Sequence, residues 1–261
     1  MNPGLRSSAS GMIAQQKMVD VIANNLANAN TTGFKRSRAS FEDVLYETVQ
    51  GPKVVDGNGV LAPMQIGRGV RLAAVTRIHG NGTMEVTGRP LDLAIEGDGF
   101  FQVKLSDGRT GYTRDGSFSL NNSGQLVTND GHQLMPELVL PPDASVVTIA
   151  EDGTVSVTAG NSGDPIELGR IELARFANPS GLLSLGGNLY VDTPASGEAV
   201  SGNPGEDGFG AVRQGTLEGS NVEVVQEMTD MIAAQRAYEI NARAIRAAED
   251  MMKSIDDLIR Y

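Results

Sequence analysis

The sequence predicts an α+β protein in which long helices at the two ends of the chain form a coiled-coil-like helical domain and the middle forms an antiparallel β domain. Near both ends, apolar residues recur at alternating spacings of four and three, which is the pattern of a helix with one apolar stripe. Between the ends, short apolar or alternating runs are separated by Asp-Gly, Asn-Gly and Ser-Gly steps, which are typical of β-hairpins. The 32 glycines fit a turn-rich β region.

The first helix is expected from about Leu5 to Asn30, with Gly33 as a left-handed cap, so the helix should end near Thr31. Its stripe consists of Leu5, Ala9, Met12, Gln16, Val19, Ala23 and Leu26. Between Met18 and Ala29, apolar residues cover almost the whole circumference. A helix that is apolar all round is normally buried on every side, which indicates that other subunits cover it.

The second helix is expected from Val222 to Ile259, and Ser220 to Glu223 has the spacing of a capping box. Its stripe consists of Val224, Met228, Met231, Gln235, Tyr238, Ala242, Ile245, Glu249, Met252, Asp256 and Ile259. At ~1.5 Å per residue this helix is on the order of 55 Å long, which exceeds a small compact domain. The two stripes most simply pair with each other or with neighbouring copies. An intramolecular hairpin of the two helices, which predicts a stable monomer, stays open on the pattern alone.

The β domain is expected at residues 71–219, while residues 1–33 and 220–261 form the helical domain. The runs expected as strands are LDLAI, GFFQV, GYTRDGSFSL, GQLVT, SVVTI, TVSV, IELGRIELARF and NLYV. Residues 34–70 are expected to form an extended connector, because the segment from Gly51 to Gly69 is rich in glycine and proline.

Composition excludes several classes of function. Lys and Arg total 21 against 32 Asp and Glu, a formal charge of -11, which argues against binding nucleic acid or an anionic membrane surface. Cysteine is absent, so disulfides, thiolate metal sites and cysteine nucleophiles are excluded. No apolar run approaches the roughly 18 residues that a membrane span requires, and the start of the chain lacks the pattern of a secretory leader.

The residue types that carry chemistry do not converge on a site. His79 and His132 each stand beside glycine without a metal-binding spacing, so we interpret both as loop or strand residues. Gly97-Asp98-Gly99 is half of a dinucleotide fingerprint, and a hairpin turn is the stronger interpretation. Turn chemistry, rather than calcium binding, explains the acidic residues before glycine at Asp98, Asp107, Asp115, Asp130, Asp152 and Asp207. No catalytic residue, cofactor or metal is expected.

Lys35, Arg36 and Arg38 form the one dense basic cluster of the sequence. They follow the expected end of the first helix, where cations offset the helix dipole. That role, or pairing with acidic neighbours, is favoured over binding of an anionic ligand.

The segment ANNLANANTTGFK, from Ala23 to Lys35, contains four asparagines at or near helical positions. Asparagine costs a helix roughly half a kcal/mol relative to alanine, so these amides are expected to have a use. A polar group in an apolar interface selects the arrangement that satisfies it. Asn24, Asn25 and Asn28 are therefore expected to fix direction and register against other helices.

Two long stretches of the chain carry a resemblance to known proteins: SGMIAQQKMVDVIANNLANANTTGFK at Ser10 to Lys35, and EGSNVEVVQEMTDMIAAQRAYEINARAIRAAEDMM at Glu218 to Met252. They are similar to the terminal signatures of the rod and hook proteins, the axial proteins of the bacterial flagellum. LDLAIEGDGFFQV and YTRDGSFSLNNSGQLVT resemble the start of the β domain of that family. FEDVLYETV and QIGRGVR resemble its distal-rod branch most, and a proximal rod or other axial subunit is the alternative.

The resemblance implies a structural subunit that catalyses no reaction. Subunits would stack helically into the distal rod, the drive shaft that transmits torque from motor to hook through the periplasmic and outer-membrane rings. The implied partners are other copies of the chain, proximal rod proteins, the hook protein, the ring proteins and the flagellar type III export apparatus, with no nucleic acid and no membrane insertion. The implied location is the basal body, in the periplasmic space and reaching the outer membrane, after export without a cleaved signal peptide.

The expected mechanism is packing, in which the two helices pair along their stripes and also contact neighbouring subunits to build an inner tube inside an outer layer of β domains. The residues expected at this assembly interface are Met12, Val19, Ile22, Ala23, Asn24, Asn25, Leu26, Asn28, Val224, Met228, Met231, Gln235, Tyr238, Ile245, Met252 and Ile259. Two other classes stay open. One is a wall-cleaving hydrolase, for which no convergent pair of carboxylates can be singled out, and the other is a monomeric β binding module with a helical hairpin.

Overall fold

The computed structural model describes residues 3–51, 53–55, 59–61, 63–142, 144–159 and 165–259. The chain divides into two compact units. The helical unit comprises Met1–Ala27, Ser37–Thr76 and Glu223–Tyr261, and the β unit comprises Asn28–Arg36 and Arg77–Val222. Helices near both ends and a largely antiparallel β region between them confirm the predicted α+β class.

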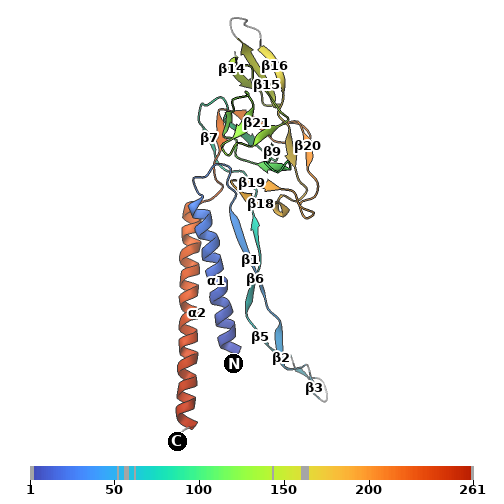
Figure 1. Cartoon of the computed structure of the whole chain (residues 1–261). Coiled ribbons are helices and arrows are strands. Elements are labelled where there is room, and N and C mark those ends of the chain that lie inside the picture. The colour runs from blue at the N-terminus through green and yellow to red at the C-terminus, as the bar shows by residue number, and fades with distance from the viewer. Residues whose placement is uncertain are drawn as a thin grey trace. The chain divides into compact units, whose positions relative to one another are not determined.

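The two long helices lie side by side in the helical unit (Figure 1). α1 (Pro3–Ala27) has 25 residues and α2 (Val224–Ile259) has 36. Pro3 suits the first helical position, because its fixed φ is helical and its missing N–H would have no partner there. At ~1.5 Å per residue, α2 is about 54 Å long.

α1 ends at Ala27, a turn earlier than predicted. The asparagines that follow form a turn instead, in which the Thr31 N–H donates to the Asn28 carbonyl oxygen at 3.2 Å. Gly33 has the predicted left-handed φ, 65°, but lies too far beyond the helix to be its cap. A Cβ at Gly33 would stand 2.6 Å from the Asp115 nitrogen, so this glycine allows a close approach of two backbone segments.

α2 begins at Val224, two residues later than predicted. Ser220 therefore lies too early in the chain to cap the helix, and the predicted capping box does not form. The Ser220 hydroxyl instead accepts a hydrogen bond from the Val222 N–H at 3.3 Å.

The buried residues in the described parts of α1 and α2 are mostly small or polar, with Ile22 as the one large apolar side chain among them. The buried positions are Ala14, Ile22 and Asn25 on α1 and Glu227 and Ala234 on α2. A Cβ at Gly11 would lie only 3.0 Å from Asn241 Nδ2, so the helices approach closely there. Several members of the predicted stripes are exposed, namely Gln16, Ala23, Val224, Met228, Gln235, Tyr238, Glu249 and Met252. The helices pack mainly along a neighbouring stripe, because small side chains allow their axes to come close.

The strands that follow α1 form a two-stranded ribbon (Figure 1). The pairs are β1 (Ser37–Asp43) with β6 (Val70–Arg77), β2 (Tyr46–Gln50) with β5 (Met64–Gly67), and β3 (Lys53–Val55) with β4 (Gly59–Leu61). Ser10 joins α1 to this ribbon, since its hydroxyl accepts from the Val70 N–H at 3.1 Å and donates to the Ser7 carbonyl oxygen at 2.8 Å.

The β unit contains the remaining strands and one short 3-10 helix, η1 (Pro179–Gly181). The strands are β7 (Met84–Val86), β8 (Leu93–Glu96), β9 (Phe100–Lys104), β10 (Thr110–Thr113), β11 (Phe118–Leu120), β12 (Leu126–Thr128), β13 (Gln133–Met135), β14 (Ala144–Ile149), β15 (Thr154–Ala159), β16 (Pro165–Arg170), β17 (Leu173–Arg175), β18 (Leu183–Gly186), β19 (Leu189–Val191), β20 (Val200–Gly202), β21 (Ala211–Gln214) and β22 (Thr216–Glu218). Each of the predicted runs contains a strand, which confirms the sequence prediction there.

The main sheet has the order β11-β12-β13-β9-β10-β19-β18, with β17 pairing β9 and β20. β14, β15 and β16 form a three-stranded sheet, and β8 and β7 pair with β21 and β22. Phe101 and Val103 of β9 lie in the larger hydrophobic cluster, whereas Phe100 lies in a smaller one with Tyr112 and Tyr190. Successive side chains of a strand point to opposite faces, so β9 separates two cores.

The Asp-Gly steps form turns, as predicted. Asp107 Oδ1 accepts a hydrogen bond from the Arg109 N–H at 3.0 Å, and Asp152 Oδ1 accepts one from the Thr154 N–H at 3.0 Å. In both cases the carboxylate binds the backbone N–H two residues later, which stabilises the turn.

Candidate assembly surface

The predicted interface residues differ widely in exposure. Ile22 and Asn25 are buried. The half-buried members are Met12, Val19, Leu26, Asn28, Met231 and Ile245, and the exposed members are Ala23, Asn24, Val224, Met228, Gln235, Tyr238 and Met252. Ile259 is the last residue of α2, and its side chain lies outside the described part.

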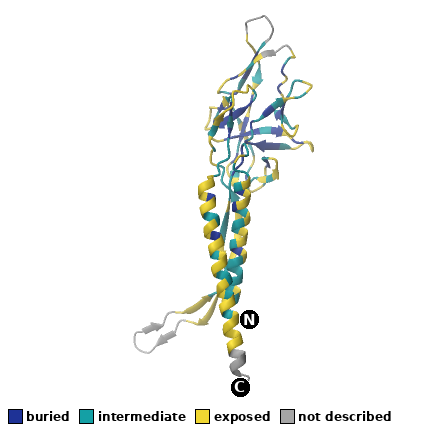
Figure 2. Ribbon diagram, turned by 90° about the vertical axis from the view of Figure 1, so that its left-hand side faces the viewer, coloured by how far each residue is buried: buried dark blue, intermediate teal, exposed yellow. Residues whose placement is uncertain are grey.

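Large apolar side chains remain exposed on both helices, and Figure 2 shows exposed residues along much of their length. This apolar helical surface consists of Ile13 on α1 and Val224, Val225, Met228, Ile232, Tyr238, Ile240, Met251 and Met252 on α2. Ile240 is 64% exposed. Where large apolar side chains lie together on an exposed surface, they mark a contact with other proteins.

Some of the predicted residues come together in grooves of the helical unit. Val19, Gln235 and Tyr238 line a groove of about 520 Å³ with Gln16 and Glu239. Asn24 lines a second groove, of about 280 Å³, whose other lining residues are Lys17, Asp20, Val21, Ser37, Leu72 and Val75. The helical unit therefore offers recesses as well as apolar side chains.

The ribbon carries a second set of exposed apolar residues. These are Leu45, Tyr46, Val49, Met64 and Ile66, of which Leu45 is 83% exposed. A two-stranded ribbon with exposed apolar side chains is only marginally stable alone, so contact with another surface would stabilise it.

Asn25 anchors α1 within its own chain. Its Nδ2 donates to the Ser37 carbonyl oxygen at 2.8 Å and to Glu227 Oε2 at 3.1 Å, while its Oδ1 accepts from the Ser37 N–H at 2.8 Å. One amide thereby ties α1 to both β1 and α2. Because Asn25 and Glu227 are buried, their polar groups require such partners, and the bond fixes the register of the two helices.

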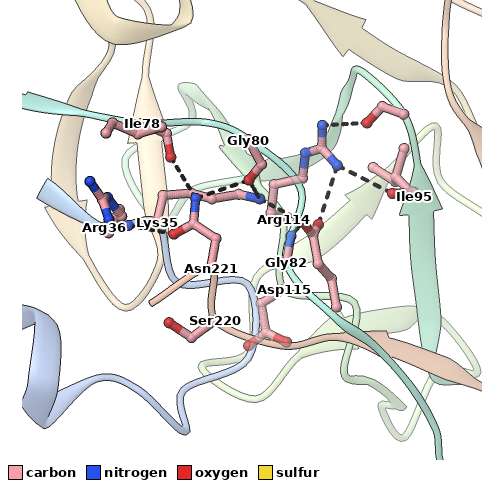
Figure 3. A network of polar contacts seen from close by, with 12 residues as sticks. Lys35, Arg36, Ile78, Gly80, Gly82, Ile95, Arg114, Asp115, Ser220 and Asn221 are labelled. Atoms are coloured by element: carbon pink, nitrogen blue, oxygen red, sulfur yellow. Dashed lines mark hydrogen bonds and ion pairs between the residues drawn. The ribbon is translucent and has the colours of Figure 1, made fainter. Parts of the chain in front are cut away.

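A buried ion cluster lies where the first and last segments of the β unit meet (Figure 3). Lys35 Nζ lies 2.5 Å from Glu218 Oε1, and Arg114 Nη1 lies 3.2 Å from Glu218 Oε2. The side chains are buried, at 0% exposure for Lys35 and Glu218 and 2% for Arg114. Two buried cations thus share one carboxylate, which is stable only if further hydrogen bonds satisfy each group.

Backbone groups supply those hydrogen bonds. Lys35 Nζ donates to the Gly80 carbonyl oxygen at 2.8 Å, and Glu218 Oε1 accepts from the Gly82 N–H at 2.8 Å. Arg114 donates to the carbonyl oxygens of Ile95 at 3.3 Å and Gly97 at 2.7 Å. The cluster therefore connects five separate segments of the chain, around Lys35, Gly80, Ile95, Arg114 and Glu218.

Asn221 extends the same network toward the start of α2. Its Oδ1 accepts from the Arg36 N–H at 2.7 Å, and its Nδ2 donates to the carbonyl oxygens of Ile78 at 2.8 Å and Gly80 at 3.0 Å. The segments that leave α1 and enter α2 are thereby fastened together.

Burial lowers the pKa of two basic groups in this region, Lys35 and His79. Desolvation lowers the pKa of Lys35 below its ordinary value, although the Glu218 carboxylate opposes this shift. Desolvation also lowers the pKa of His79 from 6.5 to about 4, assisted by the positive charges of Lys35, Arg114 and Arg77. His79 is therefore neutral at pH 7, and it packs edge-on against Phe100 and Tyr190.

The basic cluster of the sequence has one of its two expected roles. Lys35 pairs with an acidic residue, Glu218. It does not offset the dipole of α1, because that helix ends eight residues earlier and the effect is confined to the last turn. The sequence prediction missed Glu218, Arg114 and Asn221 altogether. It also missed Glu227, which could have been noticed because it lies seven residues before Ala234 and therefore on the same face of α2.

The described residues show no membrane-spanning helix, since neither long helix is apolar enough. Among these same residues, no group of three His, Asp or Glu side chains is placed to hold a metal ion.

Comparison with known proteins identifies the class. Residues 5–35 match the family described as flagella basal body rod protein, residues 94–157 match the flagellar hook protein FlgE/F/G D1 domain, and residues 213–258 match the flagellar basal body rod FlgEFG protein C-terminal region. The fold with a helix at each end therefore defines an axial structural protein of the bacterial flagellum.

Individual relatives identify the branch. The chain is 47% identical to the flagellar basal-body rod protein FlgG of Borreliella burgdorferi, with 100% of both chains covered. It is 46% identical to the FlgG of Caulobacter vibrioides, over 97% of this chain and 98% of the relative. A FlgF of that species is 36% identical over 97% of this chain. The chain belongs to the FlgG family of flagellar basal-body rod proteins, which are structural proteins and not enzymes.

Proposed function

We propose that copies of this chain assemble helically into the distal part of the flagellar rod, through the apolar helical surface and the ribbon. The observation that carries the proposal is the exposure of large apolar residues along a helix of 36 residues. Burial of a Val, Leu, Ile or Met side chain contributes roughly 1.5–3 kcal/mol, so a few such contacts stabilise an assembly substantially.

The helical units are expected to pack into a coiled-coil-like inner tube, with the β units outside them. In this proposal the helical domain comprises residues 1–33 and 220–261, the connector comprises residues 34–70, and the β domain comprises residues 71–219. α1 and α2 bury small residues against each other, which leaves the larger residues of the predicted stripes for neighbouring copies. Close packing of long helices resists bending, as a shaft that transmits torque requires.

The three asparagines Asn24, Asn25 and Asn28 are given different roles in this proposal. Asn25 already binds Ser37 and Glu227 of its own chain, so its role is to set the geometry of the helix pair. Asn24 is exposed beside a groove, and we assign it to register between subunits. Asn28 is half-buried, accepts a hydrogen bond from the Thr31 hydroxyl at 3.2 Å and shapes the exit from α1.

The location of the rod in the cell envelope and the proteins that it contacts are proposed from the family. The rod would lie in the periplasmic space and pass through the periplasmic and outer-membrane rings, with proximal rod proteins at one end and the hook protein at the other. The subunit would reach this place through the flagellar type III export apparatus.

The test is assembly of a charged variant. Ile240→Asp places a carboxylate on the apolar helical surface, where burial of an unpaired charge is costly, so rods should be absent from cells that carry it. Asn122→Asp introduces a carboxylate on an exposed turn of the β unit and should leave rods intact. Normal rods with Ile240→Asp, in a variant whose circular dichroism matches the parent chain, would refute the proposed surface.

A further inference from the structure

A small pocket in the β unit combines cations with aromatic walls. It has a volume of about 210 Å³ and is lined by His79, Asp98, Gly99, Phe100, Arg114, Arg175, Phe176, Ala177 and Pro179. The Arg114 guanidinium lies 5.3 Å from the centre of the Phe100 ring, and Phe176 packs edge-on against the same ring. The pocket thus combines two aromatic rings with two arginines and one carboxylate, Asp98.

Two residues that line this pocket each carry a buried nitrogen without a hydrogen-bond partner. Among the described residues, only three buried side-chain polar atoms have no hydrogen-bond partner in the protein, namely His79 Nδ1, Asp92 Oδ1 and Arg114 Nε. Two of the three belong to residues that line this pocket. Arg114 is 2% exposed, and leaving a buried N–H without an acceptor is costly, so the arrangement favours a ligand that accepts hydrogen bonds.

The charges around the pocket do not balance. Lys35, Arg77, Arg114 and Arg175 contribute four positive charges, whereas Glu218 and Asp98 contribute two negative ones. Glu218 is already shared by two cations. Arg175 uses Nη1 for the carbonyl oxygens of Asp207 and Gly208, at 3.1 and 3.4 Å. An anion would reduce this excess of positive charge.

We propose that this pocket binds a single carboxylate group. Two acceptor oxygens suit the two unpartnered nitrogens, with His79 in the tautomer that carries its proton on Nδ1. One negative charge halves the excess of two positive charges, and the carboxylate of Asp98, which lines the pocket, disfavours a doubly charged anion such as phosphate. The carboxylate belongs either to an Asp or Glu side chain of a second copy or to a small organic acid in solution.

The test is the imidazole NMR signal of His79 in the full chain. The protein has only two histidines, so His132→Gln assigns both rings, and the nitrogen shifts report the tautomer directly. Acetate is titrated at pH 7 and constant ionic strength, with chloride as the balancing anion and phosphate as a second probe. A saturable shift at His79 and none at His132 is expected.

Matched variants locate the effect. Arg175→Gln removes a pocket cation and should weaken the apparent acetate affinity roughly tenfold, the usual effect of one charge-assisted hydrogen bond. Arg109→Gln removes an exposed arginine elsewhere in the β unit and should leave the affinity unchanged. The amide spectrum of each variant checks that the fold is retained.

The outcomes separate the two sources of the carboxylate. If the His79 shift appears on raising protein concentration without acetate, and Arg175→Gln abolishes it, the carboxylate belongs to a second copy. If acetate alone produces it, the ligand is a free organic acid. Equal, non-saturating shifts at both histidines, or saturation by phosphate and not by acetate, would overturn the proposal.

Discussion

Lys35 and Glu218 form a buried ion pair, with Nζ 2.5 Å from Oε1, across 183 positions of sequence. Lys35 lies shortly after α1, and Glu218 is the last residue of β22, shortly before α2. The chain segments that lead to the two terminal helices are therefore joined inside the β unit. This contact requires the whole segment from Lys35 to Glu218 to be present, because its two partners are the ends of that segment.

Loss of the shared carboxylate should destabilise the β unit strongly. Glu218→Gln leaves Lys35 and Arg114 as buried cations without a counter-charge, and the free energy of unfolding should fall by about 3–5 kcal/mol. Chemical denaturation measures this free energy. Tyrosine fluorescence can follow the unfolding, because the chain has five tyrosines and no tryptophan.

A matched control is Glu96→Gln. Glu96 also pairs with an arginine, Arg213, but both side chains are about half exposed, so the change should cost no more than about 1 kcal/mol. Equal losses for the two variants would show that the buried cluster contributes no more than a surface ion pair.

Asn25→Ala should loosen the helix pair. The variant removes the hydrogen bonds to Ser37 and Glu227 from a buried position, which should lower the free energy of unfolding by about 1–3 kcal/mol. Loss of helical circular dichroism with temperature is the measurement. Asn30→Ala, at an exposed position just after α1, should leave the midpoint almost unchanged, and an equal shift would contradict the anchoring role of Asn25.

His79 should make the protein less stable in acid. Its pKa is about 4 in the folded chain against 6.5 when unfolded, so between these pH values the unfolded state binds a proton that the folded state does not. Stability contributed by the neutral ring is present above pH 6.5 and is lost as pH falls to about 4, by roughly 3 kcal/mol in total.

Variants isolate this contribution from that of the carboxylates. His79→Gln should flatten the pH dependence of the unfolding free energy between pH 6.5 and 4, whereas His132→Gln should not. An unchanged slope in His79→Gln would show that the ring does not titrate as proposed.

The sequence predicted the elements well, because their patterns are local. GFFQV became β9, with Phe100 and Phe101 on opposite faces, since alternation is a property of neighbouring residues. The ends of the helices were less accurate. Asparagine amides after Ala27 compete with the helical backbone, and this competition depends on partners beyond the helix.

Which residues contact each other was harder to predict from the sequence than the helices and strands themselves. α1 and α2 each carry more than one stripe with heptad spacing, and they bury Ala14 and Ala234, with a close approach at Gly11, rather than the predicted stripes of larger residues. The pairing of Lys35 and Arg114 with Glu218 has no local signature at all, because its partners meet only when the sheet has formed.

The central claim is that other subunits cover the apolar helical surface, and protection of a single thiol tests it most directly. The chain has no cysteine, so Ile240→Cys creates one labelling site on a side chain that is 64% exposed in the isolated chain. Ala14→Cys, at 5% exposure, is the buried control, and Asn122→Cys is the exposed control on the β unit. We expect Ile240→Cys to react with a maleimide in the purified monomer and to be protected in isolated basal bodies. Equally fast labelling of Ile240→Cys in both states would contradict it.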